Sequence, residues 1–301
     1  MEYYLLIMLS VVMFGGGFAI QDVYRKKRGS GLKISMESTC IGSLAGLAVL
    51  LLLDGFAFEF TPFTLLMASL AALNGMAFAF CTFKALDYIN LSLFSLFAML
   101  GGMMLPFLQG IIFYNERVTV AKIICVIFIC AALACTVQKG DKSKGTVFYV
   151  GIFLLNGMAG VISKLFTSSE LPKASAAGYS VWIAIMTMLL SGVAWLALSV
   201  SDKRRILEKN SSGGNCVSKK VILQSCGIGA AYGIVNKVAN FLLLIALLHV
   251  DASVQYPMVT GGTMIVSTLI SCFGDKKPSK KEIISVGIAF AGMLALFLIP
   301  V

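Results

Sequence analysis

The sequence predicts an all-α membrane protein with ten transmembrane helices, arranged as two inverted repeats of five helices. Ten apolar stretches fill the chain of 301 residues, of which 58% are hydrophobic and 13% are charged. A span across the hydrocarbon layer takes about 20 predominantly apolar residues, whereas soluble proteins carry about 25% charged residues. Segment length and composition therefore exclude a soluble protein.

The predicted spans follow one another at short intervals along the whole chain. They cover residues 3–21, 34–53, 62–83, 91–113, 119–138, 146–167, 175–199, 221–247, 252–273 and 282–300. The first is preceded by Glu2 rather than by cations, and no small-residue cleavage site follows its apolar core. We therefore expect it to remain in the mature protein and not to act as a secretory signal.

The distribution of cations predicts the orientation in the membrane. Most of the 24 lysines and arginines follow the odd-numbered spans, whereas the even-numbered loops contain only Arg117, Lys122 and Lys173. Because cytoplasmic loops carry the excess of cations, the odd-numbered loops are predicted to be cytoplasmic and both termini to lie outside the plasma membrane. Anionic membrane lipids account for the net charge of +10, so no nucleic-acid partner is expected.

Two halves of the chain resemble each other. When residues 85–105 are placed over residues 246–266, Ser92 meets Ser253, and two glycine pairs meet within one residue. This similarity predicts two five-helix repeats, 1–139 and 140–301, within one integrated membrane domain. Because five is an odd number, the second repeat must enter the membrane from the opposite face. Inverted repeats of this kind place a binding site at the membrane midplane, between the halves.

Beside the number of spans and the repeat, the sequence contains two informative patterns at helix ends. They are Pro106 followed by Asn115-Glu116-Arg117-Val118-Thr119, and Gly274-Asp275 followed by Pro278-Ser279. Over its full length the chain thus resembles the ten-span EamA-like carriers of the drug/metabolite transporter superfamily. The resemblance implies transport by alternating access, with spans one to four and six to nine around a central cavity. It also implies cytoplasmic termini, which is the reverse of the charge bias.

The eighth span has the most polar interior. Tyr232, Asn236 and Asn240 recur every four residues and so share one helix face, and Lys237 lies next to that face. A lysine at the centre of a span costs about 2.5 to 3.5 kcal/mol unless it meets water or a partner. We expect Lys237 to bind an anionic group of a substrate, although its stem is also long enough to reach the interface. Lys164, another cation within a span, lies closer to a helix end.

Four further residues complete the candidate substrate site: Asn74, Asn156, Tyr256 and Thr263. Asn74 and Asn156, each beside a glycine, are equally suited to binding substrate and to holding helices together. A threonine such as Thr263 more often joins helices than binds ligands.

Acidic residues lie in or beside the loops, and only Glu37 falls within a span, near its start. Proton-coupled multidrug carriers usually keep a carboxylate at the midplane. The sequence therefore favours a secondary transporter for a small polar metabolite, with an anionic one preferred, and multidrug or amino-acid efflux is the alternative. An intramembrane enzyme and a membrane helper without transport activity are remote alternatives.

No catalytic or metal-binding pattern is recognised. The sequence contains one histidine, His249, and neither a G-x-S-x-G nor an H-E-x-x-H string. The spacing of the cysteines suggests no metal site and no disulfide framework, so no cofactor is expected. Gly42-x-x-x-Gly46 suits a dimer contact, but inside a helical bundle it more often packs neighbouring helices, and the protein is expected to be a monomer or a homodimer.

Overall fold

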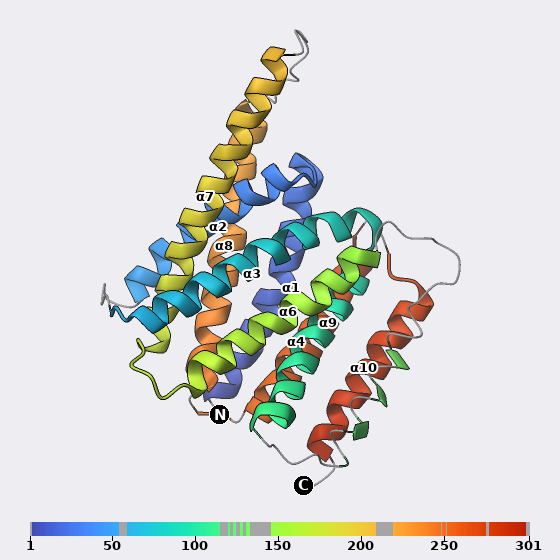
Figure 1. Ribbon diagram of the computed structural model, residues 1–301. Coiled ribbons are helices and arrows are strands. Elements are labelled where there is room, and N and C mark those ends of the chain that lie inside the picture. Colours follow the sequence, from blue (N-terminus) through green and yellow to red (C-terminus); the bar gives the residue numbers. More distant parts are fainter. Residues whose placement is uncertain are drawn as a thin grey trace.

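The structure is a computed structural model that describes residues 2–53, 59–114, 146–208, 219–247, 249–250, 252–274 and 277–298, with a few isolated residues between 120 and 132. Within these ranges all regular structure is helical (Figure 1). The helices are α1 (Glu2–Arg28), α2 (Leu32–Leu53), α3 (Pro62–Tyr88), α4 (Leu91–Tyr114), α6 (Thr146–Ser168), α7 (Ala176–Glu208), α8 (Lys219–Leu247), α9 (Ala252–Cys272) and α10 (Lys280–Leu298).

Seven of the described helices are long and apolar enough to cross a membrane. They are α1 to α4 and α6 to α8, and α9 contains a shorter apolar stretch, Met258–Cys272. The prediction of an all-α integral membrane protein is therefore confirmed for the described residues. The fifth predicted span, 119–138, falls largely outside them, so the total of ten spans stays a prediction.

Several helix ends are fixed by polar contacts close in sequence. At the start of α4, Asn90 Oδ1 accepts a hydrogen bond from the Leu93 N–H at 2.9 Å. At α10, Ser279 Oγ accepts from the Glu282 N–H at 3.3 Å, and Glu282 Oε2 accepts from the Ser279 N–H at 2.8 Å, which makes a reciprocal capping box. Gly29, with φ at 101°, allows the tight turn between α1 and α2.

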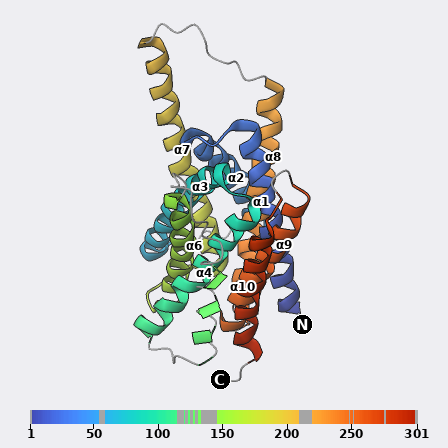
Figure 2. The same ribbon diagram turned by 90° about the vertical axis from the view of Figure 1, so that its right-hand side faces the viewer.

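Eight of the described helices form a closed ring, in which each helix packs mainly against two others. The order around this eight-helix ring is α1, α8, α2, α7, α3, α6, α4, α9 and back to α1. α10 lies outside the ring, against α9 and α4 (Figure 2). Helices from residues 1–139 alternate with helices from residues 140–301, so these two segments interlock and do not pack as separate units.

Aromatic side chains cross the ring at the end where α1 finishes and α2 begins. Phe18 of α1 meets Phe94 of α4 edge to face, with ring centroids 5.0 Å apart. Tyr24 of α1 meets Phe83 of α3 at 6.1 Å. All four side chains are almost fully buried, and three of them rank among the largest fully buried side chains of the described residues. The end of the ring nearest the α1–α2 turn is therefore filled.

Candidate functional site

α2 and α8 cross at close range because both carry glycines at the contact. Gly42 of α2 packs against Gly229 and Gly233 of α8, and a Cβ atom on Gly233 would overlap the backbone of Gly42. We call Gly42, Gly46, Gly229 and Gly233 the glycine seam. One turn along it, a Cβ atom on Gly46 would lie 2.5 Å from Cγ of Lys237. The glycines of the Gly42-x-x-x-Gly46 pattern therefore pack two helices of one chain, and the missing side chain of Gly46 makes room for Lys237.

Lys237 lies deep in the bundle, ten residues before the end of α8 at Leu247. Protein atoms surround it, yet its side chain remains partly accessible and is not sealed off. Among the described residues, no carboxylate lies within ion-pair distance of its ammonium, and none of the ion pairs found there involves it. An ammonium at this depth needs water or a polar partner. Because the Lys237 side chain is partly accessible, water or a ligand can make this contact.

The other predicted residues of α8 extend the polar surface beside Lys237. The ring of Tyr232 lies against Gly17 of α1, 3.9 Å from the position that a Cβ atom would take there. Asn240 Nδ2 donates to the backbone oxygen of Asn236 at 2.8 Å and lies 3.3 Å from its side-chain oxygen. Tyr232 and Asn236 are partly exposed, and Asn240 is exposed. α8 thus presents an accessible polar face over more than two helical turns.

Tyr256 and Thr263 lie on the side of α9 that faces the inside of the ring. Gly262 contacts α1, and the Thr268 hydroxyl lies 3.0 Å from that of a serine on α4. At 100° per residue, Tyr256 and Thr263 fall between these two contacts, opposite the exposed Leu269. The Thr263 hydroxyl is fully buried and has no hydrogen-bond partner among the described residues. It is therefore a free polar group within the bundle.

Asn74 and Asn156 both join neighbouring helices. Asn74 Nδ2 on α3 donates to the backbone oxygen of Leu155 on α6 at 2.8 Å. Asn156 Nδ2 on α6 donates to the backbone oxygen of Ala98 on α4 at 2.7 Å. Of the two roles that the sequence left open, holding helices together is the one visible in these contacts. Their role in binding substrate stays a prediction.

The predicted site residues thus fall into three groups around the ring. Tyr232, Asn236, Lys237 and Asn240 share α8; Tyr256 and Thr263 share α9; and Asn74 and Asn156 lie across the ring on α3 and α6. α8 and α9 flank α1 on either side. No hydrogen bond of the described residues links one group to another.

Sequence reasoning missed a network of charges at the filled end of the ring. Arg25 of α1 pairs with Asp22 at 2.7 Å and, across the ring, with Asp87 of α3 at 2.6 Å. Arg28 pairs with Glu37 of α2 at 2.6 Å, and both side chains are largely buried. The cations were assigned to a loop because they follow the first apolar core, but α1 continues to Arg28 and brings them opposite these carboxylates. Glu37, the one acidic residue inside a predicted span, is therefore neutralised near the helix end.

Comparison with known proteins gives the fold and no function. No protein-family model matches the sequence, and neither does any curated protein. A solved structure described only as the crystal structure of a protein superposes with a TM-score of 0.59 at 14% sequence identity. The match covers 99% of this chain and 97% of that chain. At this identity it shows a shared fold over the whole length. The regular structure of the described residues is helical, and their seven long apolar helices make the chain an integral membrane protein.

Proposed function

We propose that the protein is a secondary transporter that moves a small polar metabolite, with an anionic group bound by Lys237, by alternating access. The observation that carries this proposal is Lys237 itself. It is a lysine deep in a ring of apolar helices, partly accessible and without a carboxylate partner among the described residues. Tyr232, Asn236 and Asn240 add hydrogen-bonding groups beside it on α8. Because a charged side chain within the membrane is energetically costly, we expect Lys237 to bind a ligand.

The packing order of the ring supports an inverted repeat. An inverted repeat relates each helix to the one five numbers away, such as α1 to α6. Under this relation the contact α1–α8 becomes α6–α3, α1–α9 becomes α6–α4, and α2–α8 becomes α7–α3, and all of these contacts are present. The contacts α2–α7 and α4–α9 map onto themselves. Such an exchange is what a two-fold axis in the membrane plane would produce.

One close contact repeats in both halves. Gly15 of α1 packs directly on Val266 of α9, and Gly157 of α6 packs directly on Leu105 of α4. Leu105 and Val266 are the residues that the sequence repeat places over each other. This agreement supports the division into two related halves and, with it, the proposed membership among the EamA-like carriers.

The two ends of the ring differ, which supports alternating access. At the α1–α2 end, α1 contacts α3 and α4 across the ring. The equivalent contacts at the other end would join α6 to α8 and α9, and the backbones of the described parts of these helices do not come as close. A carrier that is closed on one side and open on the other requires this kind of asymmetry between its halves.

The test begins with ligands, because the substrate is unknown. Purified protein in detergent is heated with a panel of small carboxylates, phosphate esters and their uncharged analogues, and a binder raises Tm in proportion to the logarithm of its excess over Kd. Anions that raise Tm are then tested for saturable counterflow in proteoliposomes. Ohmic current instead of counterflow, or responses to uncharged analogues alone, would contradict the proposal.

Lys237→Met leaves an unbranched side chain of similar length and removes the charge. We expect normal membrane insertion and loss of both the anion-dependent Tm shift and counterflow. Lys164→Met is the control, because Lys164 also lies within a predicted span but nearer a helix end. A fully active Lys237→Met protein would remove Lys237 from the site.

A further inference from the structure

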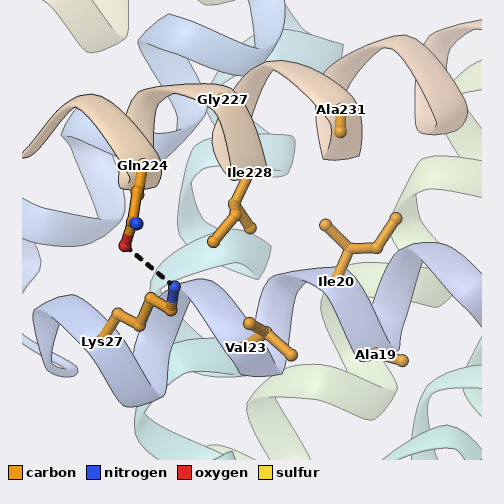
Figure 3. A pocket seen from close by; sticks show the side chains of 8 residues that line it. All are labelled: Ala19, Ile20, Val23, Lys27, Gln224, Gly227, Ile228 and Ala231. Carbon is orange, nitrogen blue, oxygen red and sulfur yellow. Dashed lines mark hydrogen bonds between the residues drawn. The ribbon is translucent and has the colours of Figure 1, made fainter. Parts of the chain in front are cut away.

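A groove runs between α1 and α8 (Figure 3). It has a volume of about 560 Å³. Ile20 and Val23 line it from α1, and Ile228 and Ala231 line it from α8. Gly227 lies in the same wall, and a Cβ atom there would meet nothing within 4 Å. The side chains of the groove are apolar over most of its length, and the small residues of α8 keep it hollow.

The groove opens away from the interior of the ring. Val23 is 43% exposed, and Gly227 and Ala231 are exposed as well. The inner face of α1 instead carries Phe18 and Tyr24, which contact α4 and α3. Because α1 and α8 are both long enough to span the membrane, the groove faces the lipid.

A single cation without a carboxylate partner lies at one end of the groove. Arg25, Lys26 and Arg28 form ion pairs with acidic residues of α1, α2 and α3. Lys27 differs, because its ammonium contacts only the neutral side-chain oxygen of Gln224, at 3.4 Å, among the described residues. The dashed line in Figure 3 marks this contact. The charge of Lys27 is therefore available to an anion from outside the chain.

We propose that this groove binds an anionic phospholipid, with an acyl chain between α1 and α8 and the headgroup phosphate on Lys27. The apolar walls suit a hydrocarbon chain, and the seven residue steps of α1 from Ile20 to Lys27 give them a length of about 10 Å. Lys27 belongs to the basic end of α1, where the positive-inside rule places the cytoplasmic headgroups. Juxtamembrane lysines attract anionic lipids. The occupant would lie against one helix from each half of the chain.

The test counts bound lipids on the purified full-length protein by native mass spectrometry. Protein in detergent is titrated with phosphatidylglycerol or with phosphatidylcholine of the same acyl chains. We expect wild-type protein to bind its first phosphatidylglycerol about fivefold more tightly than phosphatidylcholine. Lys27→Gln should remove this preference, whereas Lys26→Gln should keep it, because Lys26 is already paired with Asp22 at 3.2 Å.

A second pair of variants tests the groove itself. Gly227→Leu fills the groove with little cost to the fold, because nothing lies within 4 Å of the added Cβ atom. It should weaken the first binding event of both lipids. Gly287→Leu on α10 is the matched control, since that glycine is exposed and its Cβ atom would also meet nothing. Equal loss of preference in Lys26→Gln and Lys27→Gln, or wild-type binding by Gly227→Leu, would overturn the proposal.

Discussion

At the scale of single residues, absent side chains are as informative as present ones. Lys237 can lie between α2 and α8 only because Gly46 offers it backbone instead of a side chain. Gly42 and Gly233 bring the two helices close enough for that contact. In a membrane, where lipid is as apolar as leucine, close packing of small residues is a main source of helix association. The glycine seam therefore both joins the helices and shapes the surroundings of the lysine.

Gly233→Val should destabilise the protein strongly. Its side chain would have to occupy the space of the Gly42 backbone, and overpacking of this kind costs about 1 to 3 kcal/mol or more. Gly227→Val on the same helix should leave stability unchanged, because its Cβ atom meets nothing within 4 Å. Thermal unfolding in lipid-free detergent compares the two. Equal Tm values for both variants would mean that α2 and α8 do not touch at the seam.

The sequence predicts the face of a helix better than the partner of a side chain. Tyr232, Asn236 and Asn240 share a face because residues four positions apart lie on the same side of a helix. Whether Asn74 binds a substrate or a neighbouring helix depends on which backbone lies opposite, and Leu155 is 81 residues away in sequence. No local pattern contains that information.

At the scale of elements, two amides hold α3, α6 and α4 in succession. Asn74 ties α3 to α6, and Asn156 ties α6 to α4, each through a backbone oxygen of the next helix. A backbone oxygen has two lone pairs, so it can accept the amide N–H in addition to the bond within its own helix. The amide therefore adds a contact without breaking the helix. These three helices make the side of the ring away from the glycine seam.

Asn74→Ala and Asn156→Ala should each lower stability by about 0.6 kcal/mol, the average for hydrogen bonds between membrane helices, and by no more than about 1.7 kcal/mol. Unfolding by sodium dodecyl sulfate in mixed micelles measures the change. Asn240→Ala is the matched comparison, because the hydrogen bonds of Asn240 stay within α8 and its side chain is exposed. It should keep stability and weaken the Tm response to anions. If Asn74→Ala instead kept stability and lost that response, Asn74 would be a substrate residue.

At the scale of the whole molecule, the α1–α2 end of the ring is held by ions as well as by aromatic rings. Arg25 is nearly buried and contacts carboxylates on its own helix and on α3. The pair with Asp87 joins α1 to α3 across the ring. In the proposed alternating-access cycle, breaking that pair should favour separation of α1 from α3, because it removes an interaction that stabilises the closed end.

Asp87→Asn should make the inside of the ring more accessible. A cysteine introduced by Gln21→Cys reports on it, since Gln21 lies on α1 between the aromatic residues Phe18 and Tyr24 and is 1% exposed. A partly exposed ion pair is worth up to about 1 kcal/mol, so maleimide labelling should be up to about fivefold faster. Labelling of protein without Gln21→Cys is subtracted. Asp22→Asn is the control, because its ion pairs stay within α1. Equally faster labelling in both variants would mean that the Arg25–Asp87 pair does not hold this end of the ring closed.

Length and apolarity of the segments predicted the helices of this molecule, and the order of the helices around the ring could not be predicted in the same way. Hydropathy says where a helix crosses, but each helix of the ring has its main neighbours in the other half of the chain. The end of α1 was also placed too early, since helix continues through Arg25 to Arg28 beyond the apolar core. Charges beyond a span can stay helical when carboxylates of other helices neutralise them.

The alternation of the two halves around the ring has a consequence for biosynthesis. The ribosome releases α1 to α4 before α6 to α9, so the early helices reach the bilayer without their final neighbours. Until the later helices arrive, Gly42, Gly46 and Asn74 face lipid or temporary partners. The nascent chain can therefore complete this ring only after the last of these helices has been synthesised and inserted.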